Sequence, residues 1–162
     1  MPHAIQIRQT GGPEVLNWTA VDVGEPGSGQ VRLRQADAIS FHQAAAMMLQ
    51  GMTAQVLIRQ VYPVKAGDLI LVHAAAGGTG LILCQWAAAL GATVIGTVST
   101  EAKAEMARGH GCSHTILYTK QDFVAEVSRI SGGEKLPVVF DSVGKDNGKR
   151  CFYPTGELIA RL

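Results

Sequence analysis

The chain has 162 residues, 47% of them hydrophobic, which is enough for one ordinary domain with a sizeable core. A formal net charge of +1 gives no reason to expect nucleic acid or an anionic membrane as a partner. Because no apolar run could span a bilayer and the first residues do not resemble a signal peptide, we expect a cytoplasmic protein.

The first 37 residues predict two or three short antiparallel strands, the last over residues 31–34, with little core of their own. Residues 40–43 (SFHQ) then have the pattern of a capping box, with serine at the N-cap and glutamine three residues later. A helix is expected over residues 44–62, interrupted by Gly51.

Residues 69–82 (LILVHAAAGGTGLI) are the most informative stretch of the chain. An apolar run over residues 69–72 predicts a buried strand. It meets a turn of small residues and then a helical pattern, the order found in the phosphate-binding element of a dinucleotide fold. The spacing is A-x-x-G-x-x-G, formed by Ala74, Gly77 and Gly80. Glycines let the backbone approach a diphosphate, and the first N–H groups of the helix point at its charge. The alternative is a tight turn whose small residues serve packing.

Strand-like and helix-like segments alternate after this turn, which predicts right-handed βαβ units and a parallel sheet covered on both faces. We therefore predict an α/β fold, a Rossmann-like doubly wound sheet of about five parallel strands. The segments are a helix over residues 81–90, a strand over 93–98, a helix over 101–110, a strand over 114–118, a helix over 122–130 and a strand over 137–141.

Metal binding is not expected. Cys84, Cys112 and Cys151 are too far apart for a CxxC site and are odd in number, so we predict reduced, mostly buried thiols. The histidines also lack ligand spacing, and His73, which precedes the turn, is expected to be structural. Asp141 is expected to pair locally.

Three long stretches, AAAMMLQGMTAQ, HAAAGGTGLILCQWAAALGATVIGTVST and FDSVGKD, together resemble the quinone oxidoreductase (zeta-crystallin-like) branch of the zinc-independent medium-chain dehydrogenase/reductase superfamily. The opening, GGPEVLNWTAVDVGEPGSGQVRLR, resembles the start of the same proteins. The resemblance implies NADPH-dependent reduction of quinones or activated alkenes, without catalytic zinc, by enzymes that are usually homodimers. It also implies two parts, a vestige of a GroES-like catalytic domain over residues 1–37 and a Rossmann-like domain over residues 38–162.

The resemblance further implies that parts of the family pattern are missing. The family's loop bearing an asparagine and a tyrosine has no counterpart near residues 35–37, and the pattern after residues 151–159 is shortened. We therefore expect a truncated protein with weak or no turnover, and no catalytic residue is assigned. The alternatives are an NADPH-binding module and an inactive fragment. A quinone or enone substrate and a homo-oligomer stay open.

The end of the second strand of the predicted sheet favours NADPH over NADH. An NAD site usually has an acid at this point, whereas here Ser99 and Thr100 come first and Lys103 follows Glu101. Hydroxyl groups and a cation suit a 2′-phosphate. By resemblance, Ser99, Lys103 and Tyr118 match positions at the adenosine 2′-phosphate. The alternative is that Lys103 is a solvated helix charge and Tyr118 a surface aromatic.

Two weaker candidates lie elsewhere. Thr53 resembles a family residue near the nicotinamide, although its hydroxyl could instead bond its own helix. Ser142 and Val143 follow the fourth strand beside the expected cofactor path, although they could form a plain strand-exit turn. The complete set of predicted cofactor-binding residues is Thr53, Ala76, Gly77, Gly78, Thr79, Gly80, Ser99, Thr100, Lys103, Tyr118, Ser142 and Val143.

Overall fold

The computed structural model describes residues 3–6, 17–20, 22, 24, 25, 27, 28, 40–144 and 155–161. The chain divides into two compact units, Met1–Phe41 and His42–Leu162. In the first unit, strand β1 (His3–Gln6) pairs antiparallel with strand β2 (Asn17–Ala20). An antiparallel β segment near the N-terminus was predicted, and these two strands form it. The expected strand over residues 31–34 lies outside the described residues.

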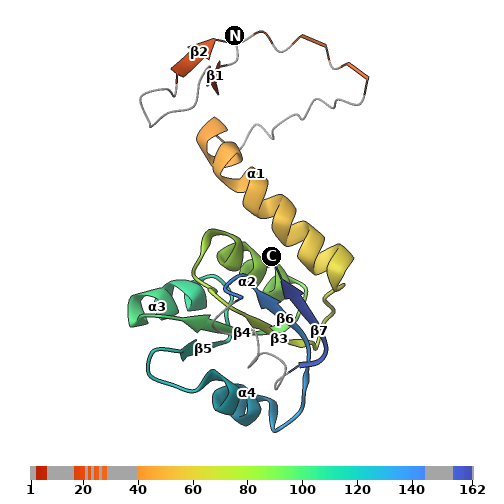
Figure 1. Ribbon diagram of the computed structural model, residues 1–162, viewed down its shortest axis with the longest axis vertical. Coiled ribbons are helices and arrows are strands. Elements are labelled where there is room, and N and C mark those ends of the chain that lie inside the picture. Colours follow the sequence, from red (N-terminus) through yellow and green to blue (C-terminus); the bar gives the residue numbers. More distant parts are fainter. Residues whose placement is uncertain are drawn as a thin grey trace. The chain divides into compact units, whose positions relative to one another are not determined.

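The second unit is built around a five-stranded sheet in which every neighbouring pair of strands is parallel. This confirms the predicted doubly wound fold (Figure 1). The order across the sheet is β5 (His114–Leu117), β4 (Thr93–Val98), β3 (Leu69–Val72), β6 (Leu136–Asp141) and β7 (Thr155–Arg161).

Three helices cover the two faces of this sheet, α2 (Gly78–Ala89), α3 (Glu101–Gly109) and α4 (Phe123–Ser131). Alternate residues of each strand face opposite sides, so the sheet has two separate cores. One core joins α2 and α3 to residues such as Val72 and Val94. The other joins α4 to residues such as Leu71 and Ile95. Figure 1 shows α4 on the opposite side of the sheet from α2 and α3.

The helix preceding the sheet differs from the prediction. Helix α1 (Phe41–Gln55) runs through Gly51 without interruption, because one glycine inside a helix costs only about 1 kcal/mol. The chain then continues as a π-helix, η2 (Val56–Val61), in which the N–H of Tyr62 donates to the oxygen of Leu57, five residues back, at 3.1 Å. The end of α1 and the start of η2 enter the sheet core, whereas the middle of α1 exposes Met47, Met48 and Met52.

The remaining boundaries follow local signals. Strands β3 and β4 have the predicted bounds, and α4 begins after Asp122, whose side chain accepts from the N–H of Val124 at 2.9 Å. It ends at Gly132, which has a left-handed conformation with φ 67°. Helix α2 begins at Gly78, three residues earlier than expected, so Gly80 of the predicted turn lies in its first turn.

Candidate functional site

Four of the predicted segments meet at one edge of the sheet. Because parallel strands all point the same way, the residues that follow β3, β4, β5 and β6 lie at their common carboxyl edge. These residues are the glycine turn, the Ser99–Thr100 pair, Tyr118 and the Ser142–Val143 pair. Strand order reverses between β3 and β6, and ligands of such sheets bind in the crevice at that reversal.

The glycine turn brings the start of α2 against the end of β3. Ala74 has a left-handed backbone with φ 52°, and its oxygen accepts the N–H of Gly77 at 2.8 Å. A Cβ at Gly77 would lie 3.1 Å from that oxygen, and a Cβ at Gly80 would collide with it and approach the oxygen of Ala75 to 2.9 Å. Position 80 therefore requires glycine for close approach, whereas a side chain at Gly77 would be tight but would need only a small shift of the Ala74 oxygen.

The start of α2 also differs from the starts of α3 and α4. Thr100 caps α3 by accepting the N–H of Lys103 at 3.3 Å, and Asp122 caps α4. The N-cap of α2 is Gly77, which has no side chain with which to accept the first N–H groups of the helix. Together with the helix dipole, these donors suit an anion such as a diphosphate.

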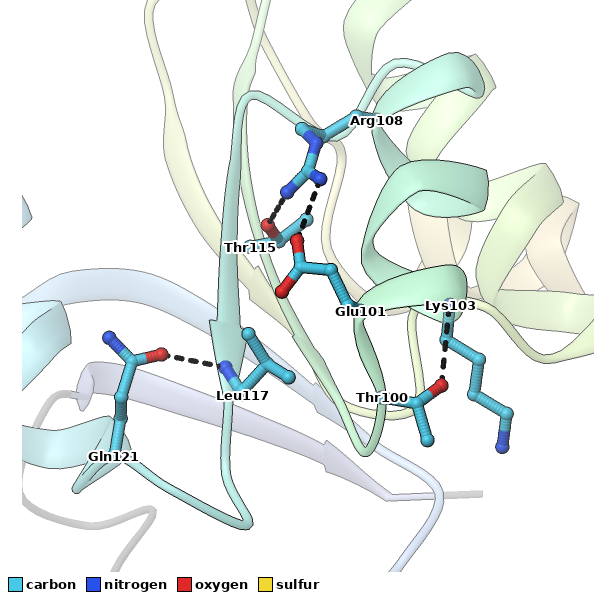
Figure 2. A network of polar contacts seen from close by, with 7 residues as sticks. All are labelled: Thr100, Glu101, Lys103, Arg108, Thr115, Leu117 and Gln121. Carbon is cyan, nitrogen blue, oxygen red and sulfur yellow. Dashed lines mark hydrogen bonds and ion pairs between the residues drawn. The ribbon is translucent and has the colours of Figure 1, made fainter.

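The end of β4 presents hydroxyl groups and a cation. The oxygen of Ser99 accepts the hydroxyl of Thr119 at 3.1 Å, which ties the loops after β4 and β5 together. Tyr118 directly follows β5, its backbone N–H donates to the oxygen of Val98 at 3.2 Å, and half of its surface is exposed (51%), so its ring can contact a ligand. Figure 2 shows the side chain of Lys103 extending past Thr100, away from the neighbouring polar cluster.

Arg108, the other cation of α3, is engaged within that cluster. Its guanidinium donates to the hydroxyl of Thr115 at 2.6 Å and to the carboxylate of Glu101 at 3.0 Å (Figure 2). Glu101 is therefore paired with Arg108. Of the two cations of α3, Lys103 is therefore the one that lies outside this cluster.

The residues after β6 are held by their own strand. Asp141, at its end, accepts the N–H groups of Val143 and Gly144 at 2.9 and 3.0 Å. The local pairing that the sequence suggested for Asp141 is thus present, and it fixes the loop containing Ser142. Val143 is 45% exposed, so it can form an apolar wall for a ligand.

Thr53 lies on α1, and its hydroxyl donates to the oxygen of Leu49 at 2.8 Å, which was the structural alternative for this residue. Helix α1 nevertheless reaches the site, because the side chain of Gln50 lies 3.4 Å from the point where Gly78 would carry a Cβ. Sequence reasoning missed Gln50. Its position three residues before Thr53, on the same helical face, was the available signal.

A second feature that sequence reasoning missed is the pairing of a buried threonine, Thr97, with His73 beneath the turn. His73, Thr97 and Asp141 are each at most 2% exposed. The Nδ1 atom of His73 lies 2.8 Å from the hydroxyl of Thr97, and burial lowers the pKa of His73 while the charge of Asp141 opposes that shift. Residue 73 follows a strand directly and residue 97 alternates with apolar neighbours, which was the available signal.

Within the described ranges, no group of three or more histidine, cysteine, aspartate or glutamate side chains could hold a metal ion. Cys84 and Cys112 are free and buried, as predicted, whereas Cys151 lies outside the described residues. In the same part of the chain, no helix has the length and apolar character needed to cross a membrane.

Comparison with known proteins agrees with this architecture. The profile of the zinc-binding dehydrogenase family matches residues 78–154. A quinone oxidoreductase from Pseudomonas aeruginosa is 50% identical over 127 residues, which are 76% of this chain and 39% of that protein. The chain thus spans about two fifths of the length of that relative.

Solved structures give the same result. The Escherichia coli quinone oxidoreductase complexed with NADPH is 47% identical, with a TM-score of 0.75 over 76% of this chain and 39% of that chain. A 2-haloacrylate reductase is 35% identical, with a TM-score of 0.79 over 99% of this chain and 72% of that one. On this sequence and fold similarity, the chain belongs to the quinone oxidoreductase branch of the medium-chain dehydrogenase/reductase superfamily.

Proposed function

We propose that the chain binds NADPH along the carboxyl edge of its parallel sheet. The observation that carries this proposal is the start of α2, where Gly77 leaves the first N–H groups without a side-chain cap and Gly80 permits close approach. The turn lies beside the reversal of strand order, where dinucleotides bind in folds of this class.

Four of the predicted residues would bind the 2′-phosphate of the cofactor. Ser99, Thr100, Lys103 and Tyr118 would hold the 2′-phosphate, since hydroxyl groups and a cation stabilise it and the nearby acid, Glu101, is paired with Arg108. The hydroxyl of Thr100 accepts the helix N–H with its oxygen and can still donate its proton to a phosphate.

The diphosphate and the nicotinamide of NADPH would be bound by residues at the same edge of the sheet. Ala76, Gly77, Gly78, Thr79 and Gly80 would hold the diphosphate at the start of α2. Ser142 and Val143 would lie toward the nicotinamide, because they follow β6 at the reversal of strand order. Thr53 is assigned to the same end of the cofactor by its resemblance to the family residue, and it shares helix α1 with Gln50, which approaches Gly78.

The reaction we propose is reduction of a quinone or activated alkene. The bound NADPH would supply hydride, and the protein would supply orientation and electrostatics. The related E. coli enzyme is a quinone oxidoreductase complexed with NADPH, and another relative is a 2-haloacrylate reductase. No described residue is assigned a catalytic role.

Low turnover is expected of these 162 residues when they are tested alone. Hydride transfer needs a closed, water-poor cleft, and the chain matches only 39% of the length of its relative from Pseudomonas aeruginosa. The second candidate is accordingly an NADPH-binding module. We further propose that residues 1–37 correspond to a GroES-like domain and residues 38–162 to the Rossmann-like domain, in a cytoplasmic protein that forms homo-oligomers.

The cofactor proposal is tested by fluorescence titration with NADPH and NADH. We expect NADPH to bind at least tenfold more tightly and Lys103→Ala to remove that preference, because one charge-assisted contact contributes about 1.5–3 kcal/mol. The matched control is Lys135→Ala, an exposed lysine directly before β6 and so at the opposite edge of the sheet. Equal affinity for the two nucleotides would contradict the proposed 2′-phosphate site.

The reductase proposal is tested by NADPH oxidation with several quinones and an activated alkene. Slow oxidation that depends on the substrate would support a reductase. Binding without any oxidation would favour the NADPH-binding module, and turnover equal to that of a full-length relative would contradict the expected impairment.

A further inference from the structure

Three polar side chains are buried at the carboxyl ends of the three central strands. They are His73 directly after β3, Thr97 in β4 and Asp141 at the end of β6. Their exposures are 2%, 1% and 1%, respectively. Buried polar groups need partners, so a cluster of this kind in the middle of a sheet fixes the positions of the strands that carry it.

His73 is attached to both neighbouring strands. Its ring atom Nδ1 lies 2.8 Å from the hydroxyl of Thr97 in β4. Its backbone N–H donates to the carbonyl oxygen of Phe140 in β6 at 2.9 Å. The Phe123 ring, at the start of α4, packs nearly perpendicular to the imidazole with the ring centres 5.0 Å apart. The carboxylate of Asp141 acts on the same imidazole through its charge.

Thr97 holds the glycine turn at two points. Its side-chain hydroxyl pairs with the side chain of His73, and its backbone carbonyl oxygen accepts the N–H of Ala75 at 3.1 Å. Ala74 lies between these two anchored residues and has a φ of 52°, a conformation that non-glycine residues rarely adopt. Such a conformation persists only where the surrounding contacts enforce it.

The conformation of Ala74 decides the shape of the turn. Its carbonyl oxygen accepts the N–H of Gly77, and Gly80 closes against the same oxygen. Rotation of this peptide would therefore move the first N–H groups of α2, which are the proposed donors to the diphosphate.

We propose that the His73–Thr97 pair is a positioning device for the dinucleotide: it holds Ala74 in its left-handed conformation and so aims the α2 amides at the diphosphate. This inference rests on the proposed NADPH function. Neither side chain needs to touch the cofactor, because both are buried beneath the turn. Asp141 acts on His73 from the next strand and in turn holds the loop after β6.

The test removes the hydroxyl of Thr97 while keeping its shape. In Thr97→Val the pairing with His73 is lost, whereas Thr97→Ser keeps the hydroxyl. The control is Leu136→Val, a buried shortening at the first residue of β6 and so at the opposite edge of the sheet from the turn. If Thr97→Val does not fold, Thr97→Ala removes the same hydroxyl with less crowding. Each variant is measured by NADPH titration, thermal unfolding and amide hydrogen exchange without ligand.

We expect Thr97→Val to bind NADPH at least tenfold more weakly and to show faster exchange at Ala75 and Gly77. Thr97→Ser and Leu136→Val are expected to bind within twofold of the unmodified chain. A Thr97→Val variant that is less stable but binds normally would overturn the inference, since that result indicates a purely structural role. If the unmodified chain does not bind NADPH, the proposed function fails and this inference fails with it, a result distinct from failure of the variant alone.

Discussion

Gly80 is the residue at which the turn leaves least room for a side chain. A Cβ there would collide with the oxygen of Ala74 and lie 2.9 Å from that of Ala75, and both are backbone atoms that cannot rotate away. We expect Gly80→Ala to weaken NADPH binding at least tenfold and to lower the free energy of unfolding by about 1–3 kcal/mol, the usual cost of overpacking.

The matched control for this substitution is Gly109→Ala at the end of α3, where an added Cβ meets nothing within 4 Å. Its NADPH affinity should equal that of the unmodified chain in the same fluorescence titration, with urea unfolding measured alongside. Equal affinities for the two variants would show that the turn can relax around a methyl group, and the close-approach argument would then be wrong.

His73 makes stability depend on pH. Burial lowers its pKa below the ordinary value of 6.5, and the charge of Asp141 offsets only part of this shift. Below pH 6.5 the unfolded chain therefore binds a proton that the folded chain does not, so stability rises with pH in this window. The contribution of His73 is fully present above its unfolded pKa and is lost as the pH falls through 6.5 toward the lower folded value.

The expected result is a free energy of unfolding that declines between about pH 7 and pH 5. The measurement is urea unfolding across this range for the unmodified chain and for His73→Gln, which cannot titrate. The difference between the two chains should shrink as the pH falls. An identical pH dependence would show that the imidazole does not contribute.

At the scale of elements, helix α2 contacts the loop before β5 through two thiols. Cys84 and Cys112 are buried, and the Cys112 thiol donates to the oxygen of His114 at 3.1 Å. A hydrogen bond with Cys112, together with burial, raises the pKa of the Cys84 thiol. Since the thiolate is the reactive form, Cys84 should be inert in the folded chain.

We expect alkylation of Cys84 to be at least a hundredfold slower in the folded chain than in urea, read from the masses of its peptides so that each cysteine is followed separately. Cys84→Ala supplies the control for assigning those peptides. Rapid modification without denaturant would contradict the packing of α2 against this loop.

The elements differ in how far sequence could predict them. The bounds of β3 and β4 follow from short apolar runs between turn residues, and the caps of α3 and α4 follow from Thr100 and Asp122. The π-helix η2 has no comparable local signal, because its wider turn depends on burying Leu57 and Ile58 in the core.

The candidate site likewise contains some features with a local sequence signal and one feature without such a signal. The glycine turn and the hydroxyl groups after β4 are local patterns, and both could be predicted from the chain alone. The His73–Thr97 pair joins residues 24 positions apart, and only the parallel register of β3 and β4 brings them together. A sequence pattern states which residues are polar but not which strands are neighbours, so this pair required the structure.

At the scale of the whole molecule, the proposed site gathers residues from four strand ends, so a bound cofactor would stabilise the entire second unit rather than one loop. A ligand at one hundred times its dissociation constant stabilises the folded state by about 2.7 kcal/mol. For a unit of this size, that corresponds to a rise in melting temperature on the order of 5–10 °C.

We therefore expect NADPH to raise the melting temperature by this amount and an equal concentration of NADH to raise it by less, because NADH lacks the 2′-phosphate that Lys103 would meet. In Lys103→Ala the two nucleotides should give equal, smaller shifts, whereas Lys135→Ala should behave as the unmodified chain. A shift of the same size with both nucleotides in the unmodified chain would contradict the proposed 2′-phosphate site at the end of β4. The absence of any shift at saturating NADPH would indicate that the α2 amides do not receive a diphosphate.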